Sequence, residues 1–308
     1  MKIIFMGTPN FAVPSLEALN EKYEVVLVVS QPAKPEGRKG ILKNPPVALK
    51  ALELGIQLFQ PEHIKNEYEY FKNIKADMIV TAAYGQFIPT KILNLYKKCI
   101  NVHGSLLPHH RGGAPIQRAI INGDKKTGIT IIKMVNKMDA GVMYAKEEVE
   151  IDDTINSTDL FLKLQVVGRD LLLKTLPDIL NNKLVGEKQN ENDVTFAYNI
   201  KREEEKISFF KKVNEVNNLI RGLSLTPGAY CYYKEKELKI YKASVYKLSD
   251  DDKEIGQIVL EGKNNLLVRC LNGYIKIEEI QLEGKQKMLA SAFLNGVNKN
   301  ELVKEKLL

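Results

Sequence analysis

Short apolar runs, each followed by polar and turn residues, dominate the first half of the chain. Runs of Ile, Val and Met are typical of strands buried on both faces, and they predict strands over 3–6, 25–29, 77–82, 99–102 and 129–134. Helices are predicted between them, capped by Asn10 and by Asn44. This alternation indicates an α/β fold with a mostly parallel, Rossmann-like sheet and helices on both faces.

The second half follows a different pattern. Apolar residues at helical spacing predict a long amphipathic helix from Ser157 to Leu180, and a polar stretch over 186–206 is typical of a linker. A helix over 213–222 and short strands over 229–233, 238–246, 256–260, 266–270 and 274–282 follow. We therefore expect a first domain over 1–185, a linker over 186–206, and a smaller β-barrel or sandwich over 207–308.

The composition indicates the cellular compartment and the kind of partner that the protein binds. The 308 residues are 44% hydrophobic and 27% charged, which is typical of a globular protein. The three cysteines form no Cys-x-x-Cys pair and no apolar run reaches membrane length, so we expect a cytoplasmic protein without a membrane partner. The net charge of +7 suits a polyanionic partner such as nucleic acid, although it also suits solubility alone.

Two familiar kinds of site are not supported. Gly7-Thr8-Pro9 follows the first strand, but the two later glycines of a dinucleotide-binding turn are missing. His109 and His110 are adjacent, so they would point to opposite faces of an extended chain, and no cysteine cluster or acidic pair accompanies them. We expect neither a nicotinamide cofactor nor a metal.

The stretch from Asn101 to Pro108 carries more chemistry. It begins at the end of a predicted buried strand, where ligands bind in open α/β sheets. Asn101 and His103, two residues apart, would lie on the same side, as an oxyanion donor and a general acid or base. Asp139, in a loop after another strand, would orient the imidazole if it lies close. The alternatives are a structural histidine and an ordinary turn aspartate.

Two basic stretches could contact phosphates. The loop over 31–44 carries Arg38 and Lys39 among glycines and prolines, which is also typical of a solvated loop. In the second domain, lysines alternate with tyrosines over 230–242, as on a nucleic-acid surface or an ordinary strand surface.

Further short motifs lie along the chain, at 5–12, 31–32, 83–85, 111–117, 127–130, 138–141, 284–288 and 293–296. Together with 101–108, they closely resemble the methionyl-tRNA formyltransferase family over nearly the whole chain. The motif around His103 is shared with other folate-dependent formyltransferases. The start at 7–9, the stretch at 111–117 and the C-terminal domain are more particular to this family.

The resemblance implies an enzyme that moves a formyl group from 10-formyltetrahydrofolate to the methionine α-amine of initiator methionyl-tRNA, without a metal. It implies that Asn101, His103 and Asp139 are catalytic, and that Arg38 and Lys39 contact the tRNA acceptor stem. The second domain resembles an OB-like barrel that holds tRNA, and we expect a monomer. The residues that match the folate-contacting loop are Ser105, Leu106, Leu107 and Pro108, beside a pterin-pocket loop over 83–89.

Two alternatives stay open. A formyltransferase acting on a glycinamide nucleotide or an amino sugar would keep the three catalytic residues but would lack a basic second domain. A nucleic-acid-binding protein on a decayed enzyme scaffold would not need them.

Overall fold

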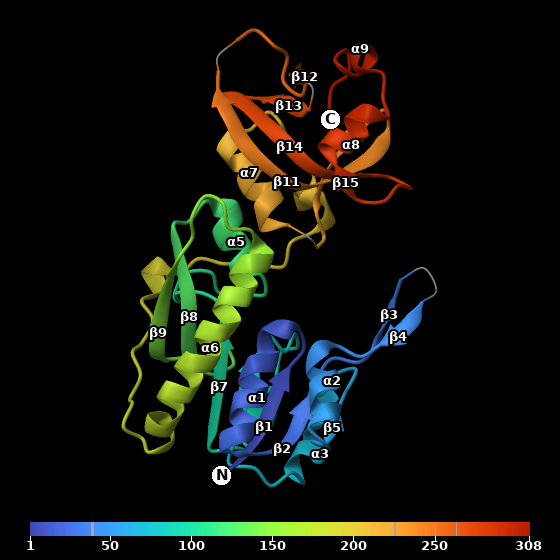
Figure 1. Ribbon diagram of the computed structural model, residues 1–308. Coiled ribbons are helices and arrows are strands. Elements are labelled where there is room, and N and C mark those ends of the chain that lie inside the picture. The colour runs from blue at the N-terminus through green and yellow to red at the C-terminus, as the bar shows by residue number, and fades with distance from the viewer. Residues whose placement is uncertain (38–39, 225, 250, 263) are drawn as a thin grey trace. The chain divides into compact units, whose positions relative to one another are not determined.

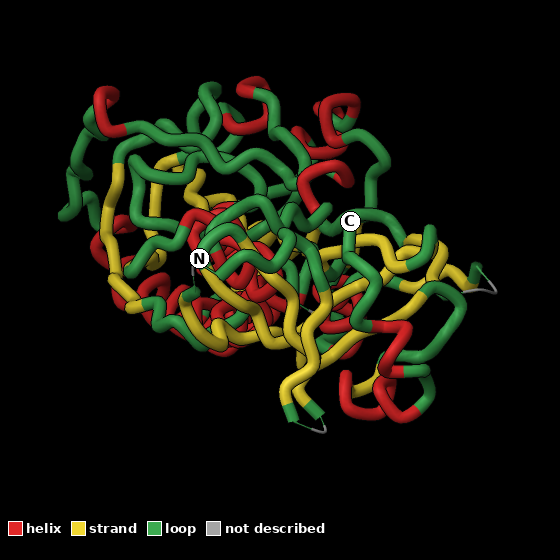
Figure 2. Tube along the Cα trace, turned by 90° about the horizontal axis from the view of Figure 1, so that it is seen from above, coloured by secondary structure: helices red, strands yellow, loops and turns green. Residues whose placement is uncertain are grey.

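The computed structural model describes residues 1–37, 40–224, 226–249, 251–262 and 264–308, and the other five residues are drawn in grey in Figures 1 and 2. The chain forms two compact units. Unit 1 comprises Met1–Pro115, Lys126–Glu150 and Phe161–Tyr198. Unit 2 comprises Ile116–Lys125, Ile151–Leu160 and Asn199–Leu308. Each unit is therefore assembled from segments that are separate in the sequence.

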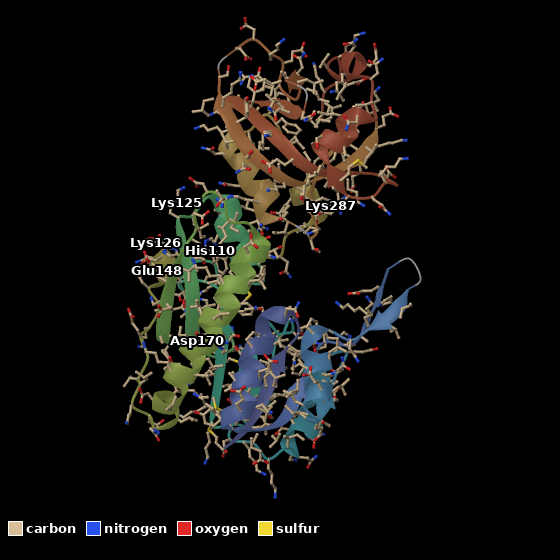
Figure 3. The ribbon with its side chains drawn as sticks, in the orientation of Figure 1. His110, Lys125, Lys126, Glu148, Asp170 and Lys287 are labelled. Carbon is tan, nitrogen blue, oxygen red and sulfur yellow. The ribbon has the colours of Figure 1, made fainter. Side chains whose placement is uncertain are left out.

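A seven-stranded sheet organises unit 1, in the order β5-β2-β1-β6-β7-β8-β9. Neighbours from β5 to β7 are parallel, and β8 pairs antiparallel with both β7 and β9. The strands are β1 (Lys2–Gly7), β2 (Glu24–Val29), β5 (Leu58–Phe59), β6 (Met78–Ala82), β7 (Lys98–His103), β8 (Lys126–Lys133) and β9 (Met143–Glu150). At the β8–β9 edge, Lys126 Nζ lies 2.6 Å from Glu148 Oε1 (Figure 3).

Both faces of this sheet are buried, which explains the continuous apolar runs. Alternate strand residues such as Ile4, Met6 and Ile79 pack with Phe71 and Ile92 of two helices on one face, while Ile3, Phe5 and Val80 are buried on the other. Gly168 lets α6 approach Val102 and Ile129 of the sheet closely. The helices are α1 (Val13–Lys22), α2 (Pro46–Glu53), α3 (Tyr68–Lys72), α4 (Thr90–Leu93) and α6 (Ser157–Leu180).

The two predicted helix caps are wrong. Asn10 is the first residue of a 3₁₀ helix, η1 (Asn10–Ala12), and Pro45 rather than Asn44 precedes α2. Neither cap position makes a side-chain capping bond, and proline at the first positions of α1 and α2 sets the helical φ instead. The Asn44 side chain accepts a hydrogen bond from Gln60 Nε2 at 3.2 Å.

The sequence patterns missed several strands, among them β9, β3 (Lys34–Glu36) and β4 (Ile41–Lys43). β9 is half exposed and carries three glutamates, so it shows no apolar run. The hairpin of β3 and β4 is exposed throughout, and it extends from unit 1 beside α2 (Figure 1). The exposed side chains of Ile41 and Leu42 lie on this hairpin.

A mainly antiparallel sheet forms the core of unit 2, in the order β10-β11-β14-β13-β12 with β15 paired to β14. Its inward side chains pack with α7 (Val213–Gly222) and α8 (Ala290–Asn295). The strands are β10 (Ala229–Tyr233), β11 (Lys236–Leu248), β12 (Ile258–Glu261), β13 (Asn265–Cys270), β14 (Gly273–Leu282) and β15 (Met288–Leu289). This unit also holds α5 (Pro115–Asn122) from residue 116, and α9 (Lys299–Leu302).

The predicted fold class is confirmed: a mostly parallel sheet with helices on both faces is followed by a smaller antiparallel β-structure. None of the helices in the described parts of the chain is long and apolar enough to cross a membrane.

Candidate functional site

Strand β7 positions the first two candidate residues at its C-terminal end. Asn101 lies opposite Thr81 of β6 and Ile132 of β8, and His103 lies opposite Thr130 of β8. The Thr81 hydroxyl donates to Asn101 Oδ1 at 2.7 Å. The amide oxygen is engaged in this way, so a ligand that binds the Asn101 amide would accept a hydrogen bond from its N–H donors.

His103 is buried, and both of its ring nitrogens approach oxygen atoms. Nε2 lies 3.0 Å from the carbonyl oxygen of His110, and Nδ1 lies 3.7 Å from Asp139 Oδ1. The carbonyl accepts a proton held on Nε2, which leaves Nδ1 at the edge shared with Asp139. The 3.7 Å separation exceeds a hydrogen bond, so a reacting group can engage either partner at this edge.

Asp139 is held in an uncommon backbone conformation. Its φ is +48°, in the left-handed region, and its Oδ2 accepts the Gly112 N–H at 2.9 Å. Oδ1 is thereby left toward His103. The structure thus brings the distant Asp139 to His103, and Asn101 lies two residues before His103 on the same strand.

The loop over 105–108 is fixed by Thr130. This hydroxyl donates to Ser105 O at 2.6 Å and accepts the Leu107 N–H at 3.1 Å. Ser105 and Leu107 are buried, and Leu107 packs with Ile132 and Met143. The side chains of Leu106 and Pro108 are partly exposed, so they and the loop backbone are the parts that a ligand can touch.

A second loop, over 83–89, is tied to the motifs at 7–9 and 31–32. Thr8 Oγ1 and Gln31 Nε2 both donate to Tyr84 O, at 2.7 and 3.3 Å. A Cβ atom on Gly7 would lie 2.7 Å from Ala12 Cβ, so this glycine permits close packing of η1 against β1. Packing therefore accounts for Gly7 without a bound pyrophosphate.

The sequence patterns missed a polar network behind Asp139. Arg111 is completely buried, its Nε donates to Gln189 Oε1 at 2.9 Å, and its Nη2 donates to Glu191 Oε1 at 2.8 Å. Hydrogen bonds from Arg111, and then from Lys137, lower the pKa of Glu191 to about 2. Gln189 and Glu191 belong to the polar stretch that was interpreted as a linker. Only the burial of Arg111, which the sequence does not show, indicates that they bind a charged partner.

The backbone of His110 was also missed. His110 has a φ of +60°, its N–H donates to Thr195 Oγ1 at 2.8 Å, and its carbonyl oxygen lies 3.0 Å from His103 Nε2. The sequence patterns indicated no role for His110, whereas its main-chain carbonyl contacts His103.

Other candidate positions lie elsewhere. Arg38 and Lys39 lie outside the described residues. In unit 2, Tyr230 and Tyr233 are buried, and Lys242 pairs with Glu278 at 3.2 Å. Lys287, which is labelled in Figure 3, lies with its Nζ 4.9 Å from the centroid of the Tyr241 ring. Part of the predicted Lys/Tyr surface is therefore core or ion pair. Among the described residues, no cluster of three His, Cys, Asp or Glu side chains could hold a metal.

Comparison with known proteins identifies the family. The formyl transferase family model matches residues 1–176, and the formyl transferase C-terminal domain matches residues 199–298. A methionyl-tRNA formyltransferase of Macrococcus caseolyticus is 44% identical, over 98% of this chain and 97% of its own. One of Streptococcus pneumoniae is 42% identical, over 99% and 98%.

A solved structure shares the fold. It is an N-formyltransferase from Helicobacter canadensis in complex with folinic acid and dTDP-3-aminofucose, with a TM-score of 0.69 and 19% identity over 94% of this chain and 100% of its own. The two family models and the full-length identity of 42–44% agree on the family. This chain belongs to the formyltransferase family and, within it, to the methionyl-tRNA formyltransferases.

Proposed function

We propose that this protein transfers the formyl group of 10-formyltetrahydrofolate to the α-amine of methionine on initiator methionyl-tRNA, for translation initiation. The observation that carries the proposal is the convergence of Asn101, His103 and Asp139 at the end of β7, with His103 Nδ1 3.7 Å from Asp139 Oδ1. The names of relatives that are 42–44% identical over nearly the whole chain, methionyl-tRNA formyltransferase, indicate the substrates.

The chemistry is a direct acyl transfer. The amine nitrogen attacks the formyl carbon, a tetrahedral oxyanion forms, and the bond from that carbon to the folate nitrogen breaks. Asn101 donates to the oxyanion through its amide N–H, and His103 does so through Nδ1–H when its ring is protonated on both nitrogens. The attacking amine loses one proton and the departing folate nitrogen gains one. Asp139, beside His103, is the group that passes the proton between them. No covalent bond to the protein is required.

The folate binds along two loops in this proposal. Ser105, Leu106, Leu107 and Pro108 form one wall, through the loop backbone and the partly exposed side chains of Leu106 and Pro108. The loop over 83–89 forms the pterin wall. Thr8 and Gln31 hold its backbone through Tyr84 O. The solved relative that holds folinic acid shares this fold and supports a folate.

The tRNA contacts are proposed at two places. Arg38 and Lys39, which lie between β3 and β4 in the sequence, would contact the acceptor stem, and the OB-like domain over 207–308 would hold the tRNA. In this proposal residues 1–185 carry the transfer and 186–206 link the domains, and the family models over 1–176 and 199–298 support the division. We propose a monomer that works in the cytoplasm, where initiation takes place.

One experiment tests the function against its main rival. The protein is incubated with 10-formyltetrahydrofolate and, in separate reactions, with Met-charged initiator tRNA, a glycinamide nucleotide and a nucleotide-linked amino sugar. Formyl-methionine, detected by mass spectrometry after tRNA hydrolysis, should form at least 100-fold faster than the other two products. Preferential formylation of the amino sugar or the glycinamide nucleotide would contradict the proposal, and so would the absence of all three products.

A further inference from the structure

The first part of the polar stretch, residues 187–197, runs against the catalytic loops as an ordered strap. Glu187 and Met143 exchange backbone hydrogen bonds of 2.8 Å. Further along, the Arg111 N–H donates to Thr195 O at 2.9 Å and the Ala197 N–H donates to Arg111 O at 2.7 Å. This strap, defined as residues 187–197, therefore packs on both the chain after β8 and the chain after β7.

Gln189 lies near the start of the strap, and both its amide oxygen and its amide nitrogen form hydrogen bonds. Its Nε2 donates to Asp139 O at 2.6 Å and to Gly141 O at 2.9 Å, and its Oε1 accepts from Arg111 Nε. An amide has one acceptor oxygen and two N–H donors, so glutamine matches this set of partners. The side chain thus joins the backbone of the Asp139 loop to a buried arginine.

The network has a fixed base. Arg111 is completely buried, so it must keep its partners, and Glu191 binds its guanidinium through both carboxylate oxygens, at 2.8 and 3.5 Å. Lys137, two residues before Asp139, donates to Glu191 Oε2 at 2.5 Å. Each end of the short segment 137–141 is therefore held by a side chain of the strap.

The same strap fixes the other donor to Asp139. The Gly112 N–H binds Asp139 Oδ2, and Gly112 lies so close to the strap that a Cβ atom there would be 2.5 Å from Ala197 O. Asp139 itself has a φ of +48°, a conformation that persists only when its surroundings hold it. Both its main chain and its carboxylate are thus placed by contacts that depend on the strap.

We propose that Gln189 is a positioning residue for formyl transfer, which holds the backbone of Asp139 so that its carboxylate faces His103. This inference rests on the proposed function, because it assigns Gln189 a role through Asp139. Gln189 does not touch the reacting atoms. It fixes the direction in which Asp139 Oδ1 points, and a displacement of about 1 Å in such a group can reduce turnover about 100-fold.

A double-mutant cycle tests the proposal in the full-length protein. Gln189→Met keeps the side-chain length but removes all three hydrogen bonds, and Gln189→Glu keeps the acceptor for Arg111 but removes the two donors to the loop. Both should lower kcat about 10- to 100-fold and leave the KM for tRNA and folate within about twofold. In an Asp139→Asn background, the same changes should lower kcat by less than about threefold, since the positioned group is already lost.

Asn192→Ala is the matched control, because it removes an exposed amide from the same strap. It should leave kcat unchanged. Hydrogen exchange of the peptide spanning 137–142 gives a second readout that needs no activity: exchange should accelerate in both Gln189 variants but not in Asn192→Ala.

Three results would overturn the inference: unchanged kcat in the Gln189 variants, an equal loss of kcat with and without Asp139, or unaltered exchange over 137–142. A wild-type protein that forms no formyl-methionine would instead refute the proposed function, and the exchange experiment would still decide whether Gln189 holds the loop.

Discussion

At the scale of single residues, Gly112 has little freedom to change. Its φ of +133° is one that side chains rarely allow, and the Ala197 carbonyl fills the space of a Cβ atom. We predict that Gly112→Ala lowers the free energy of unfolding by at least about 2 kcal/mol and also lowers kcat, because its N–H binds Asp139. Urea unfolding and a formylation assay measure the two effects.

Gly55→Ala is the control for this prediction. Gly55 also lies in unit 1 and has a positive φ of +66°, but no atom lies within 4 Å of a Cβ built there. Gly55→Ala should lower the free energy of unfolding by only about 1 kcal/mol, the cost of a positive φ for alanine, and should leave kcat unchanged. Equal effects of the two substitutions would show that the contact with Ala197 is unimportant.

The ionisation of Glu191 gives a pH-dependent contribution to stability. Its pKa is about 2 in the folded protein and near 4.5 when unfolded, so its stabilisation is fully present above 4.5 and is lost as the pH falls toward 2. We predict that Glu191→Gln is less stable than the wild type at pH 7 and that the difference shrinks below about pH 4.5. Urea midpoints between pH 7 and pH 3 measure it, and a constant difference would contradict the assignment.

The candidate residues differ in how visible they are in the sequence. Asn101 and His103 stand in a dense motif at a strand end, so residue chemistry alone indicates a site. Gln189 and Glu191 stand in a run of polar residues that is equally typical of a solvated linker. Their role depends on the burial of Arg111, 78 residues away from Gln189 in the chain, and no local pattern reports such a contact.

At the scale of elements, strand β8 supports the loop over 105–108 through one hydroxyl group. Thr130→Val preserves the shape of the side chain but leaves Ser105 O and the Leu107 N–H without it. We predict a loss of about 1–3 kcal/mol in the free energy of unfolding and a raised KM for the folate, because the loop is released. Steady-state kinetics with varied 10-formyltetrahydrofolate and urea unfolding check both.

The same strand provides the matched control. Thr127 is buried and, within the described structure, its hydroxyl has no hydrogen-bond partner. Thr127→Val should therefore be neutral or stabilising, with an unchanged KM. If Thr130→Val changed neither the stability nor the folate KM, its hydroxyl would not be what holds the loop. If Thr127→Val were equally destabilising, the effect would not be specific to the hydrogen bonds of Thr130.

Elements were predicted well where burial is symmetric. β1, β2, β6 and β7 are apolar on both faces, and α6 and α7 have the predicted bounds because their apolar residues keep helical spacing. The direction of β8 is not encoded in an apolar run, since parallel and antiparallel neighbours bury it equally. β9 and the β3–β4 hairpin lack the run altogether, so only pairing with neighbouring strands reveals them.

At the scale of the whole molecule, unit 2 depends on segments from the first half of the chain. Arg221 of α7 donates to Asp152 O and Ile155 O at 2.8 and 2.9 Å, and Ile121 of α5 packs against the core of this unit. A fragment over 1–206 leaves Ile121 without that core. We predict that it aggregates and unfolds at a lower temperature than the full chain. Light scattering and calorimetry test this.

Ile121→Lys tests whether the fragment aggregates because Ile121 has lost its packing partners or because the fragment is unstable for other reasons. In the fragment, lysine removes an exposed apolar side chain and should reduce light scattering. In the full chain it places a charge against the unit 2 core and should lower the unfolding temperature. Equal changes in both proteins would contradict the packing of Ile121 in unit 2.

The net charge of +7 predicts how tRNA affinity responds to salt. Each phosphate neutralised by Lys or Arg releases counterions, so three contacts weaken binding about 10- to 100-fold between 50 and 200 mM salt. We predict this loss for the dissociation constant of initiator tRNA, measured by filter binding, and a change below about threefold in the folate KM, since folate carries few charges. A tRNA affinity that is insensitive to salt would mean that base or shape contacts, rather than the basic surface, hold the tRNA.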